Sequence, residues 1–345
     1  MSGHAIIVGS TGQIGRASVE ALLSAGWAVT SLHRGTTTQP ADWPERGVVE
    51  VRADRADLLA AVRQAGGADV VVDTVAYDDT HARQLLDLAG DIGSAVVISS
   101  ASVYTDDSAH SLDEATGVDD FPDFDGPVVE TQPTVPPGTA TYSTAKVLLE
   151  RTLLDDGRLP VTVLRPCAIH GVGSTSPREV WPLLRALDRR PAIPLAYRGE
   201  SRFHTTSAVN LAELIRVAAG QPASRVLNAG DPEPPTVAEI VGAVGATVGH
   251  EPELVLLDKP STDGVGRTPW SVPRPFLVDM GAAERELGYA PAARYADAVV
   301  ETIAWLRDRL AKRPWRAAFP LLETYYGDLM QNYDAEDALL ASRRN

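Results

Sequence analysis

The sequence has almost no cysteine and contains no long apolar run. Its single cysteine, Cys167, excludes an intramolecular disulfide and a zinc site built from cysteines. No stretch approaches the roughly 18 consecutive apolar residues of a membrane-spanning helix, and the first residues lack the pattern of a secretory leader. We therefore expect a protein of a reducing, cytoplasmic compartment, with no membrane partner and no metal site.

Positive charge is also scarce. The 31 Lys and Arg residues are outnumbered by 46 Asp and Glu residues, which gives a net charge of −15. Affinity for nucleic acid or for an anionic membrane depends on cationic side chains that neutralise phosphates, so the charge argues against both partners. We expect a small-molecule substrate as the partner, and a homodimer stays open as an alternative to the monomer.

Short apolar runs alternate with helix-like stretches through the first half of the chain. Continuous runs such as 70–72 indicate strands that are covered on both faces, which is typical of a parallel sheet. The expected strands are 5–8, 27–32, 48–51, 69–75, 95–98, 161–164 and 226–227, and the expected helices are 12–25, 57–64, 80–89, 141–154 and 209–218. At about 150 residues a domain, 345 residues predict two units. In the smaller unit we expect a strand at 254–257 and a helix at 297–310.

Three glycines follow the first expected strand and open the first helix. Gly9, Gly12 and Gly15 give the spacing G-x-x-G-x-x-G. Glycine permits a tight turn and close approach of a pyrophosphate, while the helix N-terminus offers N–H groups to its oxygens. This placement predicts a dinucleotide site, with cofactor contacts from Gly9, Thr11, Gly12, Gln13, Ile14 and Gly15.

The end of the second strand bears on the choice of cofactor. NAD-binding sheets commonly carry an acidic residue there, whereas an arginine accommodates the 2′-phosphate of NADP. Here His33 and Arg34 occupy the segment, and it has no acid. We therefore favour NADP(H), with NAD(H) as the alternative. Asp54, after the third strand, is expected either to meet the adenine amino group or to cap a helix.

A serine, a tyrosine and a lysine form the candidate catalytic group. Ser100 ends an expected strand, and Tyr142 and Lys146 are four residues apart at the start of a helix, so they share one face. A nearby ammonium favours the phenolate, so we expect Lys146 to lower the pKa of the Tyr142 phenol. Tyr142 would then serve as general base in oxidation or as general acid in reduction. Ser100 would bond the substrate oxygen, and Lys146 would also hold the cofactor ribose.

These features resemble the extended short-chain dehydrogenase/reductases, the NAD-dependent epimerase/dehydratase family. The resemblance runs from Gly9 to about Trp305 and also rests on residues 99–104 and on Leu164-Arg165-Pro166, which closes a strand. It implies an α/β fold, with a Rossmann-type doubly wound parallel sheet and a smaller C-terminal substrate domain. It also implies that Ser100 acts with Tyr142 and Lys146 in catalysis. We place the first domain at 1–166 and 206–230, and the second, with the tail, at 167–205 and 231–345.

Two departures from the family pattern bear on the substrate. Ser100-Ala101-Ser102 stands where family dehydratases carry Thr-Asp-Glu, so sugar 4,6-dehydration is not expected. Ala168 replaces an asparagine that nucleotide-sugar members use near the diphosphate. The segment 105–139 carries nine acidic residues with no Lys or Arg, and it joins the Ser100 strand to the Tyr142 helix. We therefore expect part of it to border the site and to repel polyanions, and the alternative is a loop that its prolines hold away from the site.

The remaining assignments complete the site. The cofactor site is also expected to include Val75, Ala76, Tyr142, Lys146 and Pro166, and the substrate-binding residues are expected to be Ser100, Ser102, Tyr104, Ala168 and Arg202. His81, His170 and His204 have no metal spacing and are interpreted as structural.

The leading hypothesis is an oxidoreductase that handles a secondary alcohol or ketone of a sugar-like or polyol substrate by tyrosine-assisted hydride transfer, in net reduction. A sugar or nucleotide-sugar epimerase that works through a transient ketone is the alternative. A non-catalytic nucleotide-binding protein on the same fold is the alternative of another class.

Overall fold

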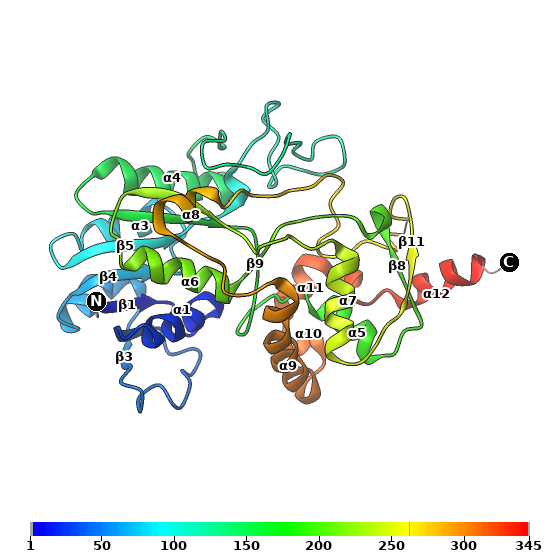
Figure 1. Ribbon diagram of the computed structural model, residues 1–345, viewed down its shortest axis with the longest axis horizontal. Helices are drawn as coiled ribbons and strands as arrows, with labels where there is room; N and C mark the ends of the chain where they lie inside the picture. The colour runs from blue at the N-terminus through cyan, green and yellow to red at the C-terminus, as the bar shows by residue number, and fades with distance from the viewer. Residues whose placement is uncertain (1–2, 262, 344–345) are drawn as a thin grey trace. The chain divides into compact units, whose positions relative to one another are not determined.

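The computed structural model describes residues 3–261 and 263–343, and the chain divides into two compact units (Figure 1). Unit 1 runs to Cys167 and also contains Ala208–Gly230 and Val278–Ala292. Unit 2 contains Ala168–Ser207, Asp231–Leu277 and the chain from Ala293 onward.

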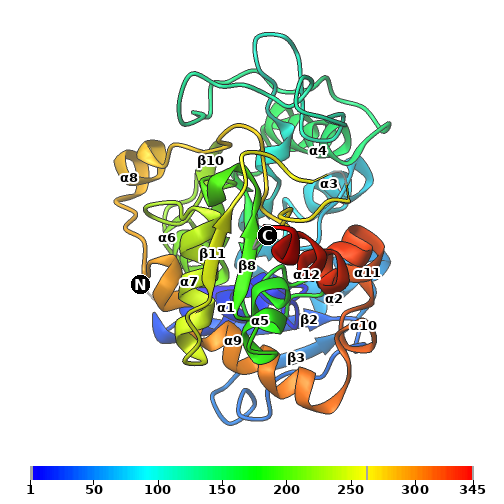
Figure 2. The same ribbon diagram turned by 90° about the vertical axis from the view of Figure 1, so that its right-hand side faces the viewer.

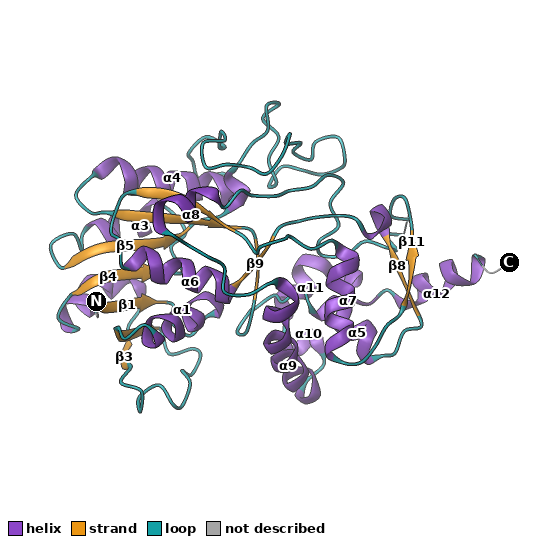
Figure 3. Ribbon diagram, in the orientation of Figure 1, coloured by secondary structure: helices purple, strands orange, loops and turns teal. Residues whose placement is uncertain are grey.

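Unit 1 is built on a seven-stranded parallel sheet with the strand order β10-β6-β5-β4-β1-β2-β3. Figure 3 draws the strands in orange and labels β5, β4 and β1 next to one another. Its strands are β1 (His4–Val8), β2 (Ala28–His33), β3 (Val49–Arg52), β4 (Ala68–Asp73), β5 (Ile92–Ile98), β6 (Val161–Pro166) and β10 (Arg225–Ala229). Each overlaps an expected strand, so the predicted parallel sheet is confirmed. The order reverses between β1 and β4, and ligands of open parallel sheets bind at such a switch point.

Helices cover both faces of this sheet. They are α1 (Gln13–Ser24), α2 (Leu58–Gln64), α3 (Asp79–Leu86), α4 (Tyr142–Asp156), α6 (Ala208–Ala219) and α8 (Gly281–Leu287), with short 3-10 helices η1 (Arg55–Asp57) and η2 (Ala101–Val103). Alternate strand residues such as Ile6 and Val71 pack in one buried cluster with Leu58 of α2, Leu85 of α3 and Leu149 of α4. On the other face α1 packs along α6. The doubly wound architecture is therefore confirmed.

One boundary prediction is wrong. The sequence analysis assigned 278–292 to the second domain, but this segment belongs to unit 1. The Asn228 side chain donates hydrogen bonds to the carbonyl oxygens of Val128 at 2.8 Å and Asp279 at 3.2 Å, and Val128 forms a bridge with Val278. A buried amide of β10 thus holds the returning segment, and no local sequence pattern signals this long-range contact.

Unit 2 contains two small parallel pairs and a group of helices. The paired strands are β7 (Ala168–His170) with β9 (Thr205–Ser207), and β8 (Ala192–Leu195) with β11 (Glu253–Leu256), which lie side by side in Figure 2. The helices are α5 (Val180–Leu187), α7 (Val237–Thr247), α9 (Tyr295–Lys312), α10 (Trp315–Ala318), α11 (Pro320–Tyr326) and α12 (Tyr333–Ser342), with 3-10 helices η3 (Ala196–Gly199) and η4 (Gly327–Gln331). Within the described ranges, no helix combines the length and apolarity that crossing a membrane requires.

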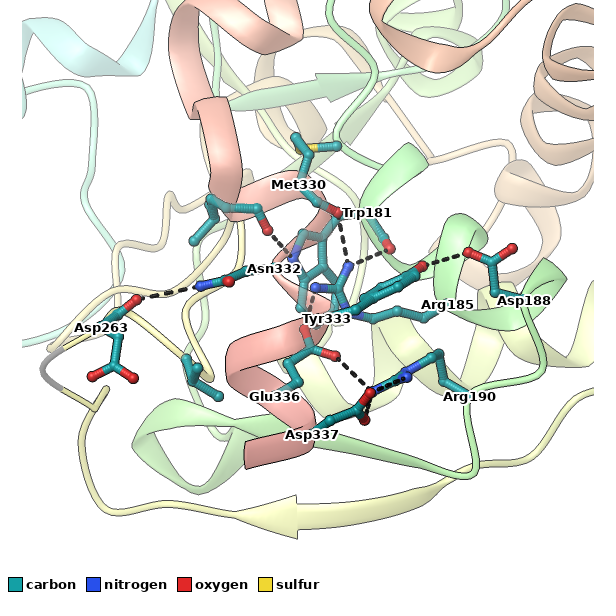
Figure 4. A network of polar contacts seen from close by, with 12 residues as sticks. Trp181, Arg185, Asp188, Arg190, Asp263, Met330, Asn332, Tyr333, Glu336 and Asp337 are labelled. Atoms are coloured by element: carbon teal, nitrogen blue, oxygen red, sulfur yellow. Dashed lines mark hydrogen bonds and ion pairs between the residues drawn. The ribbon is translucent and has the colours of Figure 1, made fainter. Parts of the chain in front are cut away.

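The C-terminal tail packs on unit 2 through one buried arginine (Figure 4). Arg185 of α5 is 1% exposed, pairs with the Glu336 carboxylate of α12, and donates to the Met330 carbonyl oxygen at 3.0 Å. Tyr333 donates to the Asp188 carboxylate at 2.7 Å. These contacts hold the tail against α5 of the same unit.

Candidate functional site

The glycine loop forms a close-fitting turn after β1. Gly9 has a φ of +80°, in the region that favours glycine, and a Cβ at Gly15 would lie 2.2 Å from the Gly9 carbonyl oxygen. Only glycine fits at position 15 without moving the backbone. The N-cap of α1 is Gly12, which has no side chain to occupy the first turn. This is the cradle that a pyrophosphate requires, so the residues present fit a dinucleotide cofactor.

At the end of β2 the two candidate cofactor residues differ. His33 is buried, its Nδ1 accepts the Gly35 N–H at 3.0 Å, and its Nε2 lies 3.1 Å from the Glu50 carboxylate. The Nδ1 atom is therefore hydrogen-bonded within the protein, whereas Nε2 lies near the carboxylate without a hydrogen bond to it. Arg34 is exposed and has no pairing partner among the described residues. For Asp54 the capping alternative is present, because its carboxylate accepts the Ala56 N–H at 3.0 Å.

Lys146 anchors the candidate catalytic group to the sheet. Its ammonium is buried and donates to the carbonyl oxygens of Ala76 at 2.6 Å and Ile98 at 2.9 Å. These carbonyls follow β4 and end β5, so Lys146 lies at the carboxyl edge of the sheet beside the switch point. The Lys146 Nζ is 5.5 Å from the centroid of the Tyr142 ring. The predicted shared helix face of Tyr142 and Lys146 is therefore confirmed.

The protonation states differ from the expectation. Burial raises the pKa of Tyr142 to about 12, and a hydrogen bond with Ser100 opposes this rise only in part. The Tyr142 residue nevertheless keeps 40% of its surface accessible to solvent. Burial also lowers the pKa of Lys146 to about 8, against the opposing effects of Asp73 and Glu150. The ammonium is directed at two carbonyl oxygens, and Lys146 is not among the groups that shift the pKa of Tyr142, so the predicted lowering by Lys146 is not seen. Tyr142 is a neutral acid at pH 7.

Three serines connect the end of β5 to α4. Ser100 and Ser143 each donate a hydrogen bond to the Ser102 hydroxyl oxygen, at 2.9 Å and 2.8 Å. Ser100 also caps η2 by accepting the Ser102 N–H at 3.1 Å. Ser100, predicted to be catalytic, and Ser102, predicted to bind substrate, therefore belong to one network beside Tyr142.

A buried ion pair that the sequence analysis missed supports this network. Glu150, one helical turn beyond Lys146, accepts from Arg165 at 3.0 Å and 2.5 Å and from the Ser99 hydroxyl at 2.5 Å. Glu150 is 3% exposed and Arg165 is 5% exposed. The sequence signal that could have indicated this ion pair is a glutamate four residues after the lysine, together with an arginine in a strand.

Tyr104 does not have the predicted role in substrate binding. Its side chain is fully buried and its hydroxyl donates to the Asn228 side-chain oxygen at 2.6 Å. The Arg165 guanidinium also lies over its ring, 4.8 Å from the centroid. Tyr104 is therefore a core residue that ties β10 to the segment after β5.

The other candidates have structural surroundings of their own. Val75 is 49% exposed beside Gly9, whereas Ala76 and Pro166 are buried at strand ends of unit 1. In unit 2, Ala168 is 3% exposed, and Arg202 donates to the Pro234 carbonyl oxygen at 2.9 Å, so the predicted contacts of these two residues with substrate stay predictions. Among the described residues, no cluster of His, Cys, Asp and Glu is suited to hold a metal ion.

His170 forms a buried ion pair with Asp231 inside unit 2, at 2.8 Å from Nε2 to Oδ2. Asp231 also accepts hydrogen bonds from the Thr205 hydroxyl at 2.8 Å and the Ser207 N–H at 2.7 Å. Burial alone would raise the pKa of Asp231, but the imidazole and these donors hold it well below its usual range. The interpretation of His170 as a structural residue agrees with this geometry.

The ion pair predicts a pH dependence of stability. The folded pKa of Asp231 is lowered, so its stabilising contribution is present above the unfolded pKa of about 3.9 and is lost as the pH falls below it. From about pH 6 to about pH 3, the wild type should lose roughly 1 kcal/mol more unfolding free energy than the double variant Asp231→Asn/His170→Gln, which removes both titrating partners of the buried pair. Urea unfolding at both pH values measures this, with Asp258→Asn, whose side chain is 90% exposed, as the control. Equal pH dependence in the wild type and the double variant would contradict the assignment.

The chain is similar to a known family of proteins. The sequence matches the NAD dependent epimerase/dehydratase family over residues 5–230. No curated protein sequence matches the chain.

Three similar solved structures share the fold. UDP-glucose-4-epimerase from Stenotrophomonas maltophila, with bound NAD and formylated UDP-arabinopyranose, is 19% identical with a TM-score of 0.68 and covers 90% of this chain and 100% of its own. UDP-N-acetylglucosamine 4-epimerase from Bacillus cereus is 19% identical with a TM-score of 0.66, covering 89% and 100%. dTDP-glucose 4,6-dehydratase from Bacillus anthracis, in complex with NAD, is 18% identical with a TM-score of 0.64, covering 88% and 96%.

Proposed function

Because the chain belongs to the NAD dependent epimerase/dehydratase family, we propose that it is a nicotinamide-dependent oxidoreductase acting on a secondary alcohol or ketone. The proposed substrate is sugar-like or a polyol, and the proposed net reaction is reduction of the ketone. One observation carries the proposal: the Lys146 ammonium bonds the carbonyl oxygens of Ala76 and Ile98 at the ends of two sheet strands, beside the Tyr142 ring and the Ser100 hydroxyl.

The cofactor is held, in this proposal, by the glycine loop and Lys146. When bound, the nicotinamide supplies or accepts the hydride. Tyr142, a neutral phenol at pH 7, would donate its phenolic proton to the ketone oxygen of the substrate. Ser100 would bond the same oxygen and orient it. The phenol would regain a proton from solvent, since the Tyr142 side chain is 40% exposed.

Epimerisation is the second candidate, favoured by the similar epimerase structures. An epimerase oxidises its substrate and returns the hydride, so it keeps its cofactor, whereas a net reductase exchanges the cofactor at each turnover. Denaturing the purified protein releases any nicotinamide that it has kept through purification. Identifying this retained nicotinamide therefore separates epimerisation from net reduction. Candidate sugars and polyols are then mixed with the protein, and the absorbance of reduced nicotinamide is followed. Steady loss of absorbance supports reduction, and tightly retained cofactor with no net change supports epimerisation.

We further propose that NADP(H) is preferred, since Arg34 is exposed at the end of β2 and the segment 31–35 has no acid. The similar solved structures are described with NAD, so this proposal departs from them. The loss of one charged contact to a phosphate should weaken NADPH binding about tenfold or more in Arg34→Asp, while NADH binding should improve. Calorimetric titration of both cofactors measures this, with Arg151→Asp on the surface of α4 as the control. Equal affinities that Arg34→Asp leaves unchanged would contradict NADP(H) preference.

A further inference from the structure

One carboxylate of the acidic segment 105–139 contacts the start of α4. The Asp113 Oδ2 accepts the backbone N–H of Ser143 at 2.7 Å. Ser143 is the second residue of α4 and directly follows Tyr142, the first. An acidic group at this end of a helix satisfies an N–H group that lacks an intrahelical partner and interacts favourably with the helix dipole. The contact therefore acts on the turn that carries Tyr142.

The loop that presents Asp113 is held by hydrogen bonds of its own. Thr105 forms an antiparallel bridge with Ser111, two residues before Asp113. The Asp106 carboxylate is buried and accepts the N–H groups of His110 at 2.8 Å and Asp123 at 3.0 Å. These bonds fix the loop on both sides of residue 113. Asp113 is thus supplied by an ordered part of the loop.

The same contact reaches the serine network. Ser143, whose N–H is bonded to Asp113, donates its hydroxyl to Ser102, and Ser102 accepts from Ser100 as well. A carboxylate of the loop, the first turn of α4 and the end of β5 are therefore joined by three consecutive hydrogen bonds. Any displacement of Asp113 would be transmitted to the hydroxyl that is proposed to orient the substrate oxygen.

We propose that Asp113 is a positioning residue, which caps α4 from the acidic loop and places a negative charge at the helix turn that carries Tyr142. The inference rests on the proposed function for the role of Tyr142, but the contact and the charge exist without it. The charge disfavours the phenolate of Tyr142, and it disfavours anionic substrate groups at this turn of the helix. The substrate class that fits is a neutral or cationic polyol or amino sugar.

The groups facing the Tyr142 side chain support this reading. They are Asp113 from the loop, Ser100 from the end of β5, Tyr77 from the segment after β4, with ring centroids 5.7 Å apart, and Lys146 from α4 itself. Burial raises the pKa of Tyr142, and among these neighbours the Asp113 carboxylate raises it further while Ser100 lowers it. The Lys146 ammonium is directed at the carbonyl oxygens of Ala76 and Ile98. Asp113 is thus the anionic group in this set.

The test reads Tyr142 directly and needs no substrate. A fluorotyrosine placed at position 142 titrates at lower pH than tyrosine, within the range where the protein stays folded, and its ¹⁹F signal reports its ionisation. In Asp113→Asn the amide oxygen can still accept the Ser143 N–H, so only the charge is removed. We expect its apparent pKa to fall by about half a pH unit or more relative to the parent protein. Asp119→Asn, an exposed acid of the same loop, is the matched control and should leave the titration unchanged.

Hydrogen exchange of the unliganded protein tests the cap separately. Asp113→Ala removes the acceptor, so the amides of 142–145 should exchange at least several-fold faster, whereas Asp113→Asn should preserve their protection. Equal titration shifts in Asp113→Asn and Asp119→Asn, or unchanged exchange in Asp113→Ala, would overturn the proposal. If both effects appear but Tyr142 proves irrelevant to turnover, the proposed function fails while the positioning contact stands.

Discussion

Replacing Tyr142 with phenylalanine is expected to lower turnover about 100-fold or more, the range for loss of a general acid–base group. The phenylalanine keeps the ring that packs 5.7 Å from Tyr77 and 5.5 Å from the Lys146 ammonium, so the fold and cofactor binding should be nearly unchanged. Only the phenolic proton is removed. The measurement is the rate of nicotinamide oxidation with the substrate found in the cofactor assay, together with the cofactor dissociation constant.

Tyr325→Phe is a matched control, since this tyrosine of α11 is 64% exposed in unit 2 and plays no part in the proposed site. Its turnover should equal that of the wild type. Should Tyr142→Phe keep turnover within a few-fold of the wild type, Tyr142 would not be the proton donor. A loss of cofactor binding in the same variant would instead point to a structural role for the hydroxyl.

Replacing Glu150 with glutamine is expected to be the most destabilising of the substitutions considered. Glutamine has the same shape, but it leaves the Arg165 guanidinium, which is 5% exposed, without a compensating charge. Breaking a buried pair by neutralising one partner typically costs about 3–5 kcal/mol. The hydroxyl of Ser99 also loses its carboxylate acceptor. Urea unfolding followed by circular dichroism measures the loss.

Two further variants make this result interpretable. Glu114→Gln, at an exposed position of the acidic loop, should unfold at the wild-type urea concentration. Replacing both Glu150 and Arg165 with leucine should recover much of the loss, because apolar residues of similar volume often replace a buried ion pair without penalty. A loss below about 1 kcal/mol in Glu150→Gln would mean that the pair is not desolvated as its burial indicates.

The fold of unit 1 was largely predictable from local patterns. Continuous apolar runs such as 70–72 mark strands covered on both faces, and the glycine spacing marks the turn after β1. The return of 278–292 to unit 1 was not predictable, because it depends on the Asn228 side chain bonding Asp279 across the fold. The short strands β7 and β9 also escaped prediction, since their three-residue runs carry no periodicity.

The candidate site was predictable in position but not in electrostatics. The spacing of Tyr142 and Lys146 fixes their shared helix face, whereas their pKa values depend on burial and on which acceptors the ammonium reaches. Tyr104 illustrates the same limit. A hydroxyl after a strand at the carboxyl edge of a sheet suggests a ligand contact, but its partner, Asn228, comes from a distant strand.

The two units are built from alternating segments of the chain, and this order has a consequence for synthesis on the ribosome. The chain passes between the units at 167–168, 207–208, 230–231, 277–278 and 292–293. When residue 167 emerges, unit 1 still lacks the edge strand β10 and the helix α6, and Asn228 is not yet available to accept from Tyr104. Unit 1 can complete its packing only after Ala292 has been made, by which time most of the segments of unit 2 are exposed as well. The nascent chain must therefore hold two unfinished cores at once, which favours assistance by chaperones during translation and makes either unit a poor choice for expression as a continuous fragment.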